Sequence, residues 1–187
     1  MGLFGAIKEL FKLNKELKKS IAKAKENEAR YLAMSLEDLS ALSDDELFNA
    51  IVSRTENKVG GFEDWADGVN ALNNSQKIFY SLNWLEMEVN NGGLCQFFVN
   101  SSRMVAPLVS EYMGIVGANE HKKLYDDFVT ENGIDLSDLS DFDIEKVEEY
   151  EEKTQKYPFD EYDAVFYDME PLETYLKKFI RNNLADF

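Results

Sequence analysis

The single cysteine and the single histidine of this chain are its first candidates for catalysis. A thiol beside an imidazole can act as a nucleophile, because the imidazole removes the thiol proton. Cys95, however, lies in the apolar stretch GGLCQFF, which is typical of a small buried residue, and His121 lies near a predicted helix start, which is typical of a surface group. The sequence therefore does not favour a Cys95–His121 pair. A lone cysteine also excludes an internal disulfide and a zinc site built from several cysteines.

Carboxylates could instead hold a metal ion. Four acids of the segment DLSDLSDFDIEKVEEYEEK match the ligand spacing of an EF-hand calcium loop: Asp141, Asp143, Glu145 and Glu152. Lys146 stands where that loop needs a glycine, which argues against calcium. The sequence has no phosphate-binding glycine loop, nucleophile elbow or histidine-rich metal motif. We therefore predict no catalytic residue, no metal site and no cofactor, and we expect the protein not to be an enzyme.

The same segment, residues 135–153, is an unusual concentration of charge, with nine acids against two lysines. Its first part repeats every three residues, with acids on one phase and apolar residues on the next. The acids are Asp135, Asp138 and Asp141, and the apolar residues are Leu136, Leu139 and Phe142. This spacing predicts 3₁₀ or helical turns that expose the acids and bury the apolar groups.

From Asp141 onward the spacing is that of an α-helix. One face carries Ile144, Val147, Tyr150 and Tyr157, and another carries Asp141, Glu145, Glu148, Glu149 and Glu152. Like charges at this spacing destabilise a helix by a few tenths of a kcal/mol per pair. The acids therefore either keep the protein soluble or bind a basic partner. The predicted partner-binding residues are Asp135, Asp138, Asp141, Glu145, Glu148, Glu149 and Glu152.

Net charge limits the classes of partner. The chain carries a formal charge of −16, but residues 1–30 hold eight bases and four acids, which leaves −20 on residues 31–187. Such a surface attracts basic partners and repels nucleic acid, so direct nucleic-acid binding by the main body is not expected. No stretch reads as a secretory signal or a membrane span, and we predict a cytoplasmic protein.

Capping and glycine signals divide the main body into helices. Ser43 and Glu46 have the spacing of a capping box. A long apolar stripe follows Ser75 and stops at Gly92 and Gly93, where glycine can end a helix.

Two more helices are bounded further along the chain. Pro107 and Gly117 suit the start and the end of one, and Asn119 and Gly133 suit the cap and the stop of the next. One or two helices follow the acidic segment, and strand patterns are scarce. The predicted fold is all-α, a compact multi-helix domain.

The N-terminal region predicts a basic amphipathic helix over residues 3–24. Its apolar face carries Phe4, Ile7, Phe11, Leu17 and Ile21, and its other face carries Lys8, Lys12, Lys15, Lys19 and Lys23. Such a helix can lie on an anionic membrane or dock a partner. We expect it to pack on its own acidic domain, and we do not expect membrane contact. The predicted organisation is this helix over residues 1–33 and a single acidic helical domain over residues 34–187.

The segment YSLNWLEMEVNNGGLCQFFVNSS, residues 80–102, resembles the signature of a bacterial family of small acidic all-helical proteins, formerly a domain of unknown function. The eponymous member of that family is a DNA-mimic protein. The residues that carry the resemblance are Glu86, Glu88, Asn90, Asn91, Gly92, Gly93, Gln96, Phe97, Phe98, Asn100 and Ser101. Cys95 departs from the polar residue expected there. A looser agreement extends over residues 40–187.

The resemblance implies a non-enzymatic protein that presents carboxylates where DNA presents phosphates and so occupies the DNA-binding surface of a partner such as a transcription regulator. The signature residues are then structural: they are expected to build a corner between helices, with side-chain amides capping backbone groups. One helical stripe carries about one charge per 5 Å, against about one per 1.7 Å in duplex DNA. Acids of residues 35–48 and 160–171 would have to add further rows.

Two alternatives remain open from the sequence. An immunity protein or antitoxin could use the same acids to neutralise a basic toxin or nuclease. A small hydrolase could hold an unrecognised carboxylate site. The sequence also leaves open the identity of the partner and whether the protein forms a homodimer.

Overall fold

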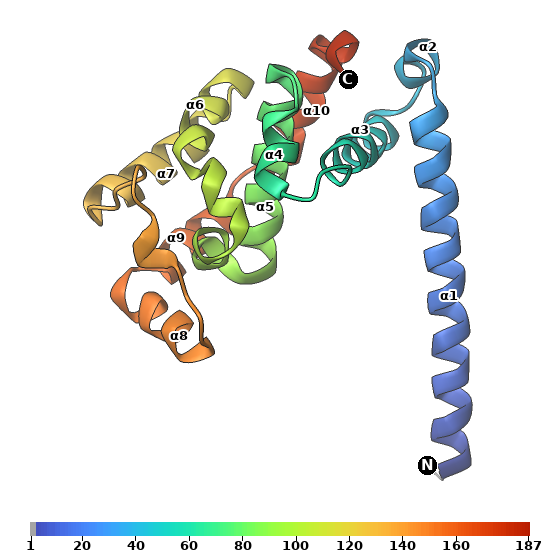
Figure 1. Ribbon diagram of the computed structural model, residues 1–187, viewed down its shortest axis with the longest axis horizontal. Helices are drawn as coiled ribbons and strands as arrows, with labels where there is room; N and C mark the ends of the chain where they lie inside the picture. Colours follow the sequence, from blue (N-terminus) through green and yellow to red (C-terminus); the bar gives the residue numbers. More distant parts are fainter. Residues whose placement is uncertain (1–2) are drawn as a thin grey trace. The chain divides into compact units, whose positions relative to one another are not determined.

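The computed structural model describes residues 3–187, except for the side chains of residues 3–8, 10, 11 and 147. The described chain is helical and contains no strand, which confirms the all-α prediction (Figure 1). The α-helices are α1 Leu3–Ala33, α2 Leu36–Ser40, α3 Asp44–Val59, α4 Trp65–Asn70, α5 Asn74–Val99, α6 Ala106–Val116, α7 Asn119–Glu131, α8 Val147–Lys156, α9 Phe159–Asp168 and α10 Leu172–Asn182. The 3₁₀ turns are η1 Ser101–Val105, η2 Ser140–Phe142 and η3 Leu184–Asp186.

The chain divides into two compact units, Met1–Arg54 and Thr55–Phe187. This division differs from the boundary predicted between residues 33 and 34. The difference arises because the end of α1 is tied to α3. Arg30 Nη2 lies 2.6 Å from Glu46 Oε1, and Arg54 Nη1 donates a hydrogen bond to the carbonyl oxygen of Met34 at 3.3 Å.

In the N-terminal unit, α1 continues past the amphipathic pattern of residues 3–24 and ends at Ala33, the last residue of the region assigned to this helix from the sequence. Apolar side chains of the N-terminal part of α1 are exposed, with Leu13 at 67%, Leu17 at 59% and Ile21 at 48%. Phe4, Ile7 and Phe11 of the predicted apolar face lie outside the described side chains. The face is thus not covered within the described part of this unit. Among the described residues, the helices lack the combination of length and apolar character that crossing a bilayer requires.

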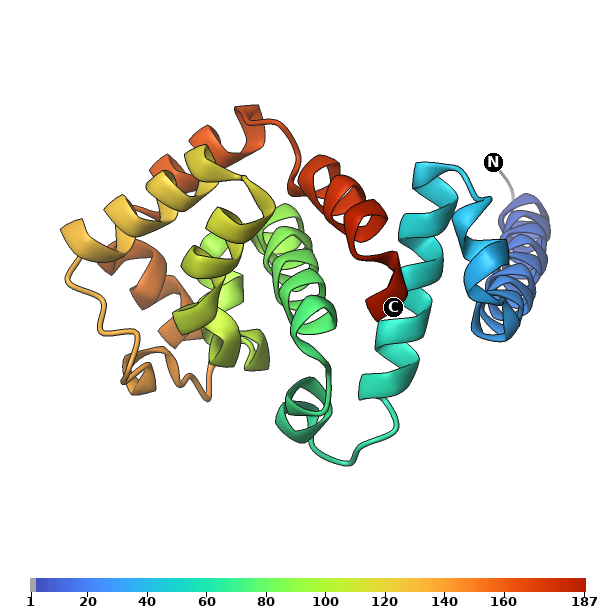
Figure 2. The ribbon, with the colours of Figure 1, turned by 90° about the horizontal axis from the view of Figure 1, so that it is seen from above.

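In the second unit, α5 is the central helix, in contact with α4, η1, α6, α8, α9 and α10 (Figure 2). Asn73 caps its start in a capping box with Gln76. The predicted apolar stripe of α5 is fully buried: Ile78, Leu82, Leu85 and Val89. This burial contributes to the driving force for folding, because each large apolar side chain removed from water contributes about 1.5–3 kcal/mol.

The predicted bounds of α6 are confirmed, and one predicted cap of α7 is wrong. Pro107 lies in the first turn of α6, and Gly117 ends that helix in a left-handed conformation with φ of 85°. Asn119 is the first helical residue of α7, and the cap position belongs to Ala118. Because Asn119 is already inside the helix, it cannot serve as the cap.

The threefold repeat of the acidic segment folds only partly as predicted, because Leu136 and Leu139 are half-buried and the 3₁₀ turn is limited to Ser140–Phe142. Asp135, Asp138 and Asp141 are exposed, whereas Phe142 is buried. The Phe142 ring stacks on the ring of Phe98 from α5, with 4.8 Å between their centroids. The aromatic residue thereby fixes the acidic segment to the core of the unit.

Candidate partner-binding surface

Asp135 and Asp138 are held in local turns by serines that follow them. The Asp135 carboxylate accepts hydrogen bonds from the backbone N–H and the hydroxyl of Ser137, at 2.9 and 2.6 Å. Asp138 accepts a bond from the backbone N–H of Ser140 at 3.1 Å. These bonds lower the pKa of both carboxyls, because they stabilise the charged form. Both acids therefore remain ionised and exposed near neutral pH.

Asp141 is not a free acid. Its carboxylate lies 2.8 Å from Lys156 Nζ and 3.0 Å from Lys153 Nζ, and it accepts a bond from the Tyr157 hydroxyl at 2.9 Å. Hydrogen bonds from Lys156 and then Lys153 hold the pKa of Asp141 well below its usual range. Two lysines of α8 thus balance its charge, so Asp141 contributes little to a surface that must attract a basic partner.

The acidic helix begins at Val147 and not at Asp141, which corrects the prediction. The Glu149 carboxylate accepts hydrogen bonds from the backbone N–H groups of Glu145 and Lys146, at 2.7 and 3.3 Å. These bonds occupy N–H groups at the helix start, whose partners would otherwise be missing. Glu149 is therefore a structural cap, and the bonds to Glu145 and Lys146 lower its pKa.

Three predicted carboxylates of this segment are exposed and bind no described side chain or backbone group: Glu145, Glu148 and Glu152. Glu148 and Glu152 are four residues apart on α8, and Glu145 lies just before the helix. Since an uncompensated charge is what a cationic partner can bind, we define these three residues as the free acidic row.

A second group of acids borders a groove between α7 and α9. The groove has a volume of about 260 Å³, and Phe128 and Tyr162 contribute to its walls. Asp127, Glu131 and Glu161 surround it. The sequence predicts a contribution from acids of α9 but none from acids of α7. Only the packing of the two helices brings both sets of acids to one groove.

The unit Thr55–Phe187 carries most of the excess charge. It holds twenty-seven acids and eleven bases, a net charge of −16. Several bases are already paired with acids on the same surface, including Lys122 with Asp126, Lys123 with Asp127 and Lys177 with Glu173. Exposed pairs of this kind add little stability, and each neutralises one acid as well as one base.

The break in α5 positions the acidic helices. Gly93 has φ of 78° and ψ of 175°, a conformation that is essentially restricted to glycine. The backbone N–H of Leu94, at the start of the second helical segment, donates to Asp163 Oδ1 of α9 at 2.8 Å. A Cβ at position 93 would lie 2.1 Å from Asp163 Oδ2. The predicted break at Gly92 and Gly93 is confirmed, and it brings α9 into direct contact with the backbone.

Two tyrosines attach the acidic helices to the same corner. The hydroxyl of Tyr150, from α8, donates to the carbonyl oxygen of Gly92 at 3.0 Å. The hydroxyl of Tyr167, from α9, donates to the carbonyl oxygen of Val89 at 2.7 Å. Both carbonyls lie beside the break in α5. The corner therefore holds both α8 and α9, although the sequence analysis named neither tyrosine for this role.

Beneath the corner, Glu88 is a buried carboxylate with three polar partners. Only 6% of Glu88 is exposed. It accepts hydrogen bonds from Gln96 Nε2 at 2.5 Å, Asn100 Nδ2 at 2.9 Å and Ser102 Oγ at 3.2 Å. The predicted backbone capping by these amides is wrong, because the amides donate their hydrogen bonds to the Glu88 carboxylate. This network links the two segments of α5 to η1.

The other signature residues divide between core and surface. Phe97 and Phe98 are fully buried, whereas Asn90 and Asn91 are exposed. The outer part of the signature is thus available to solvent while the inner part builds the core.

Comparison with known proteins identifies the family of this architecture. The family model described as DMP19-like protein matches residues 70–183, more than half of the chain. The chain belongs to the DMP19-like family. The matched range contains the corner, the Glu88 network and the whole acidic segment, and it leaves out α1. No curated protein matches, and no solved structure matches.

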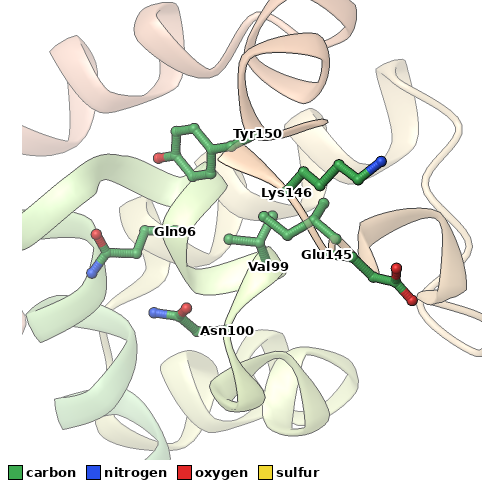
Figure 3. Close-up of a pocket in the computed structure, with 7 residues that line it drawn as sticks. Gln96, Val99, Asn100, Glu145, Lys146 and Tyr150 are labelled. Carbon is green, nitrogen blue, oxygen red and sulfur yellow. The ribbon is translucent and has the colours of Figure 1, made fainter. Parts of the chain in front are cut away.

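A pocket of about 500 Å³ lies beside this DMP19-like corner (Figure 3). Gln96, Val99 and Asn100 of α5 form one part of it, and Glu145, Lys146 and Tyr150 of the acidic segment form another. In Figure 3 the charged ends of Glu145 and Lys146 point away from the amides of Gln96 and Asn100. The charged groups of Glu145 and Lys146 therefore do not meet the amides of Gln96 and Asn100 at one point, as the groups of a catalytic site would have to do.

The candidate nucleophile of this DMP19-like chain is buried as predicted. Burial raises the pKa of the Cys95 thiol to about 11, and the groups that influence its charge are Tyr150, Asp163 and Lys153. Neither ring nitrogen of His121 has a hydrogen-bond partner. Cys95 is thus a thiol without an activating imidazole.

The prediction that His121 is a surface group is wrong. His121 is 1% exposed. Its ring makes T-shaped contacts with the rings of Phe166 and Tyr175, with 5.4 and 5.8 Å between the ring centroids. Helices α9 and α10 cover it, which local sequence does not reveal. Burial lowers its pKa below the ordinary value of 6.5, and the nearby charge of Glu120 opposes this effect.

This burial predicts a pH-dependent stability. The unfolded chain binds a proton at His121 more readily than the folded chain does, so the His121 contribution to stability is present above pH 6.5 and decreases as the pH falls below it. We expect the wild-type free energy of unfolding to decrease, relative to that of His121→Phe, between about pH 7.5 and 5.5. Urea unfolding of both proteins across this range measures the difference.

The comparison with a variant is needed because Glu86 titrates with the opposite sign. Burial raises the pKa of Glu86 to about 7, so its protonated form stabilises the fold at low pH and this contribution is lost as the pH rises through 7. Glu86 is common to both proteins and cancels in the difference. Parallel stability curves for the two proteins would contradict the assignment to His121.

Metal ligands do not gather on the described surface. Among the residues with described side chains, no group of three or more His, Cys, Asp or Glu is arranged to hold a metal ion. In the calcium-loop alignment considered above, Asp141 is bound by lysines.

Proposed function

We propose that this protein is a non-enzymatic, acidic DNA-mimic-like binding protein that occupies the DNA-binding surface of a basic partner such as a transcription regulator. The observation that carries the proposal is the DMP19-like match over residues 70–183, because the eponymous member of the family is a DNA mimic. The charge of −16 on the matched unit supports it.

The arrangement of free carboxylates adds a physical argument. Along α8 alone, acids recur about once per 5 Å, which is sparser than the charge of duplex DNA at about one per 1.7 Å. The exposed turns of Asp135 and Asp138 and the acids of the α7–α9 groove supply additional rows. Both ribbon views place α7, α8 and α9 at the same end of their unit (Figures 1 and 2). A basic protein surface could therefore meet several rows at once.

The proposed surface is smaller than the set predicted from sequence. Asp141 and Glu149 belong to the structure of the acidic segment, since lysines bind the first and backbone N–H groups bind the second. The acids of residues 35–48 fall in the other unit. The rows that remain are the free acidic row, Asp135 with Asp138, and Glu131 with Glu161, because Lys123 pairs with Asp127.

Capture of the partner tests the proposal. The full-length protein is immobilised and exposed to lysate of the organism that encodes it, and retained proteins are eluted with duplex DNA. We expect a basic DNA-binding protein that DNA releases, because both ligands would compete for one surface. We also expect its affinity to fall at least about tenfold between ~50 and ~200 mM salt, since exposed charges are screened.

Other outcomes of the capture would replace the proposal. A retained toxin or nuclease that duplex DNA does not release would indicate an immunity function. The absence of any retained protein, together with turnover in a substrate screen, would indicate an enzyme. Retention that is independent of salt would show that the acids do not make the contact.

A further inference from the structure

Helix α1 exposes an apolar face that neither the family match nor the proposed function uses. Leu13, Leu17 and Ile21 recur at intervals of four residues, so they lie on one side of the helix, and all three are exposed. Exposed large apolar side chains are common singly, but an aligned set on one helix marks a binding face.

The opposite side of α1 is basic. At 100° per residue, Lys12, Lys15, Lys19 and Lys23 face away from the apolar side chains, and all four are exposed. Residues 1–30 carry a net charge of +4, whereas the rest of the chain carries −20. The helix therefore combines an apolar face with a charge opposite to that of the protein to which it belongs.

In contrast to the expectation from the sequence, we propose that α1 binds in the plane of an anionic lipid surface. Its apolar side chains enter the boundary between headgroups and acyl chains, and its lysines contact the anionic headgroups. Helices of this composition bind membranes through the sum of buried apolar area and electrostatic attraction. The acidic unit, with any partner bound to it, would then be held at a membrane surface. The inference is independent of the proposed DNA mimicry.

The two faces together favour lipid over other occupants. Nucleic acid attracts the lysines but offers no apolar acceptor for Leu17 and Ile21. A second copy of α1 could cover the apolar side chains, but it brings the same lysines, which repel each other. At a lipid surface both faces are satisfied, because long lysine side chains bend toward the headgroups while the apolar side chains stay buried.

The acidic part of the chain opposes this binding, but only over a short distance. The 31 residues of α1 span about 46 Å at 1.5 Å per residue. Lys12 and Tyr31 are thus about 28 Å apart along the axis. Charges are screened over about 8 Å at physiological salt. The lysines of the N-terminal half of α1 are therefore screened from Glu37 and Asp38, the acids of α2 that follow α1 in the same unit.

Sedimentation with lipid vesicles tests the proposal on the full-length protein. Vesicles of phosphatidylcholine with about 30 mol% phosphatidylglycerol are compared with vesicles of phosphatidylcholine alone. We expect binding to the anionic vesicles and at least about tenfold weaker binding to the neutral ones, because each lysine near an anionic surface adds attraction. Binding should also weaken as salt increases.

Two variants separate the apolar contribution from charge. The triple change Leu13→Gln, Leu17→Gln and Ile21→Gln leaves the charge and the helix propensity almost unchanged, and we expect at least about tenfold weaker binding to the anionic vesicles. The control is Glu9→Gln with Glu16→Gln, which introduces the same residue type on the polar side and should bind equally or more strongly. Circular dichroism checks that both variants remain helical.

Several results would overturn the proposal. It fails if the wild-type protein does not bind anionic vesicles, if it binds neutral vesicles equally, or if the apolar variant binds like the wild type. Self-association that the apolar variant abolishes, without any vesicle binding, would assign the face to a second copy. Binding of a short duplex DNA to α1 in place of vesicles would assign it to nucleic acid. None of these results depends on whether the acidic unit binds a DNA-binding protein.

Discussion

Charge reversal of the free acidic row is expected to weaken binding to the basic partner at least about 100-fold. The variant carries Glu145→Lys, Glu148→Lys and Glu152→Lys. Each change removes an attraction and places a cation against a cationic surface, and like charges brought together at an interface cost several kcal/mol. Isothermal titration with the captured partner measures the loss, and circular dichroism checks that the helices are retained.

The choice of these three residues follows from their surroundings. Their carboxylates are exposed and bind no described group, so their replacement leaves the fold intact. Reversal of Glu149 would remove the cap of α8, and reversal of Asp141 would place a lysine beside Lys153 and Lys156. A loss of binding in either of those variants could result from local unfolding and would say little about the surface.

A control of equal charge separates a specific surface from general attraction. Glu63→Lys, Glu111→Lys and Glu120→Lys change the net charge by the same amount, and the replaced side chains are also exposed. Glu111 is on α6, which lies far from α8 within their unit (Figure 1). We expect this control to weaken binding only a few fold. Equal losses in the two triple variants would mean that net charge alone attracts the partner.

Replacement of Gly93 by alanine is expected to destabilise the protein by about 3–5 kcal/mol. The conformation at Gly93 costs a residue with a Cβ about 1–3 kcal/mol. The added Cβ would also lie 2.1 Å from Asp163 Oδ2. Asp163 must then move away from Leu94 N, and the loss of a hydrogen bond to a charged group costs a further 1.5–3 kcal/mol or so. Urea unfolding followed by tryptophan fluorescence measures the change.

Gly117 provides a matched control for this prediction. It also has positive φ, at 85°, but a Cβ there would meet no atom within 4 Å. Gly117→Ala should therefore cost only about 1–2 kcal/mol for the left-handed conformation. Combining Gly93→Ala with Asp163→Ala should cost less than the sum of the single changes, because the steric conflict is removed. Equal costs for Gly93→Ala and Gly117→Ala would contradict the close approach of Asp163.

Features set by neighbouring residues were predictable from the sequence. The apolar stripe of α5 follows from helical spacing, and its break follows from two adjacent glycines. Pro107 and Gly117 mark the ends of α6 because their backbone preferences act locally. The resemblance of residues 80–102 agrees with the family match over residues 70–183.

Features that depend on residues distant in the sequence were not predictable. Helical spacing placed Asp141 in the acidic stripe, whereas Asp141 lies in a 3₁₀ turn outside any α-helix. Two lysines of α8 and the tyrosine that follows this helix bind its carboxylate. His121 has the surroundings of a surface residue along the chain, yet Phe166 and Tyr175 bury it. In each case the partner lies more than ten positions away, beyond the reach of periodicity.

The strong negative charge, the helical character and the glycine corner follow from composition and short-range spacing, because backbone preferences and formal charges belong to the residues themselves. The availability of a given carboxylate does not. Lysines, backbone N–H groups or amides bind Asp141, Glu149, Glu88 and Asp163, whereas the carboxylates of Glu145, Glu148 and Glu152 are exposed and bind no described group. Only packing makes that distinction, because a carboxylate is compensated by whatever donor the folded chain brings within hydrogen-bonding distance.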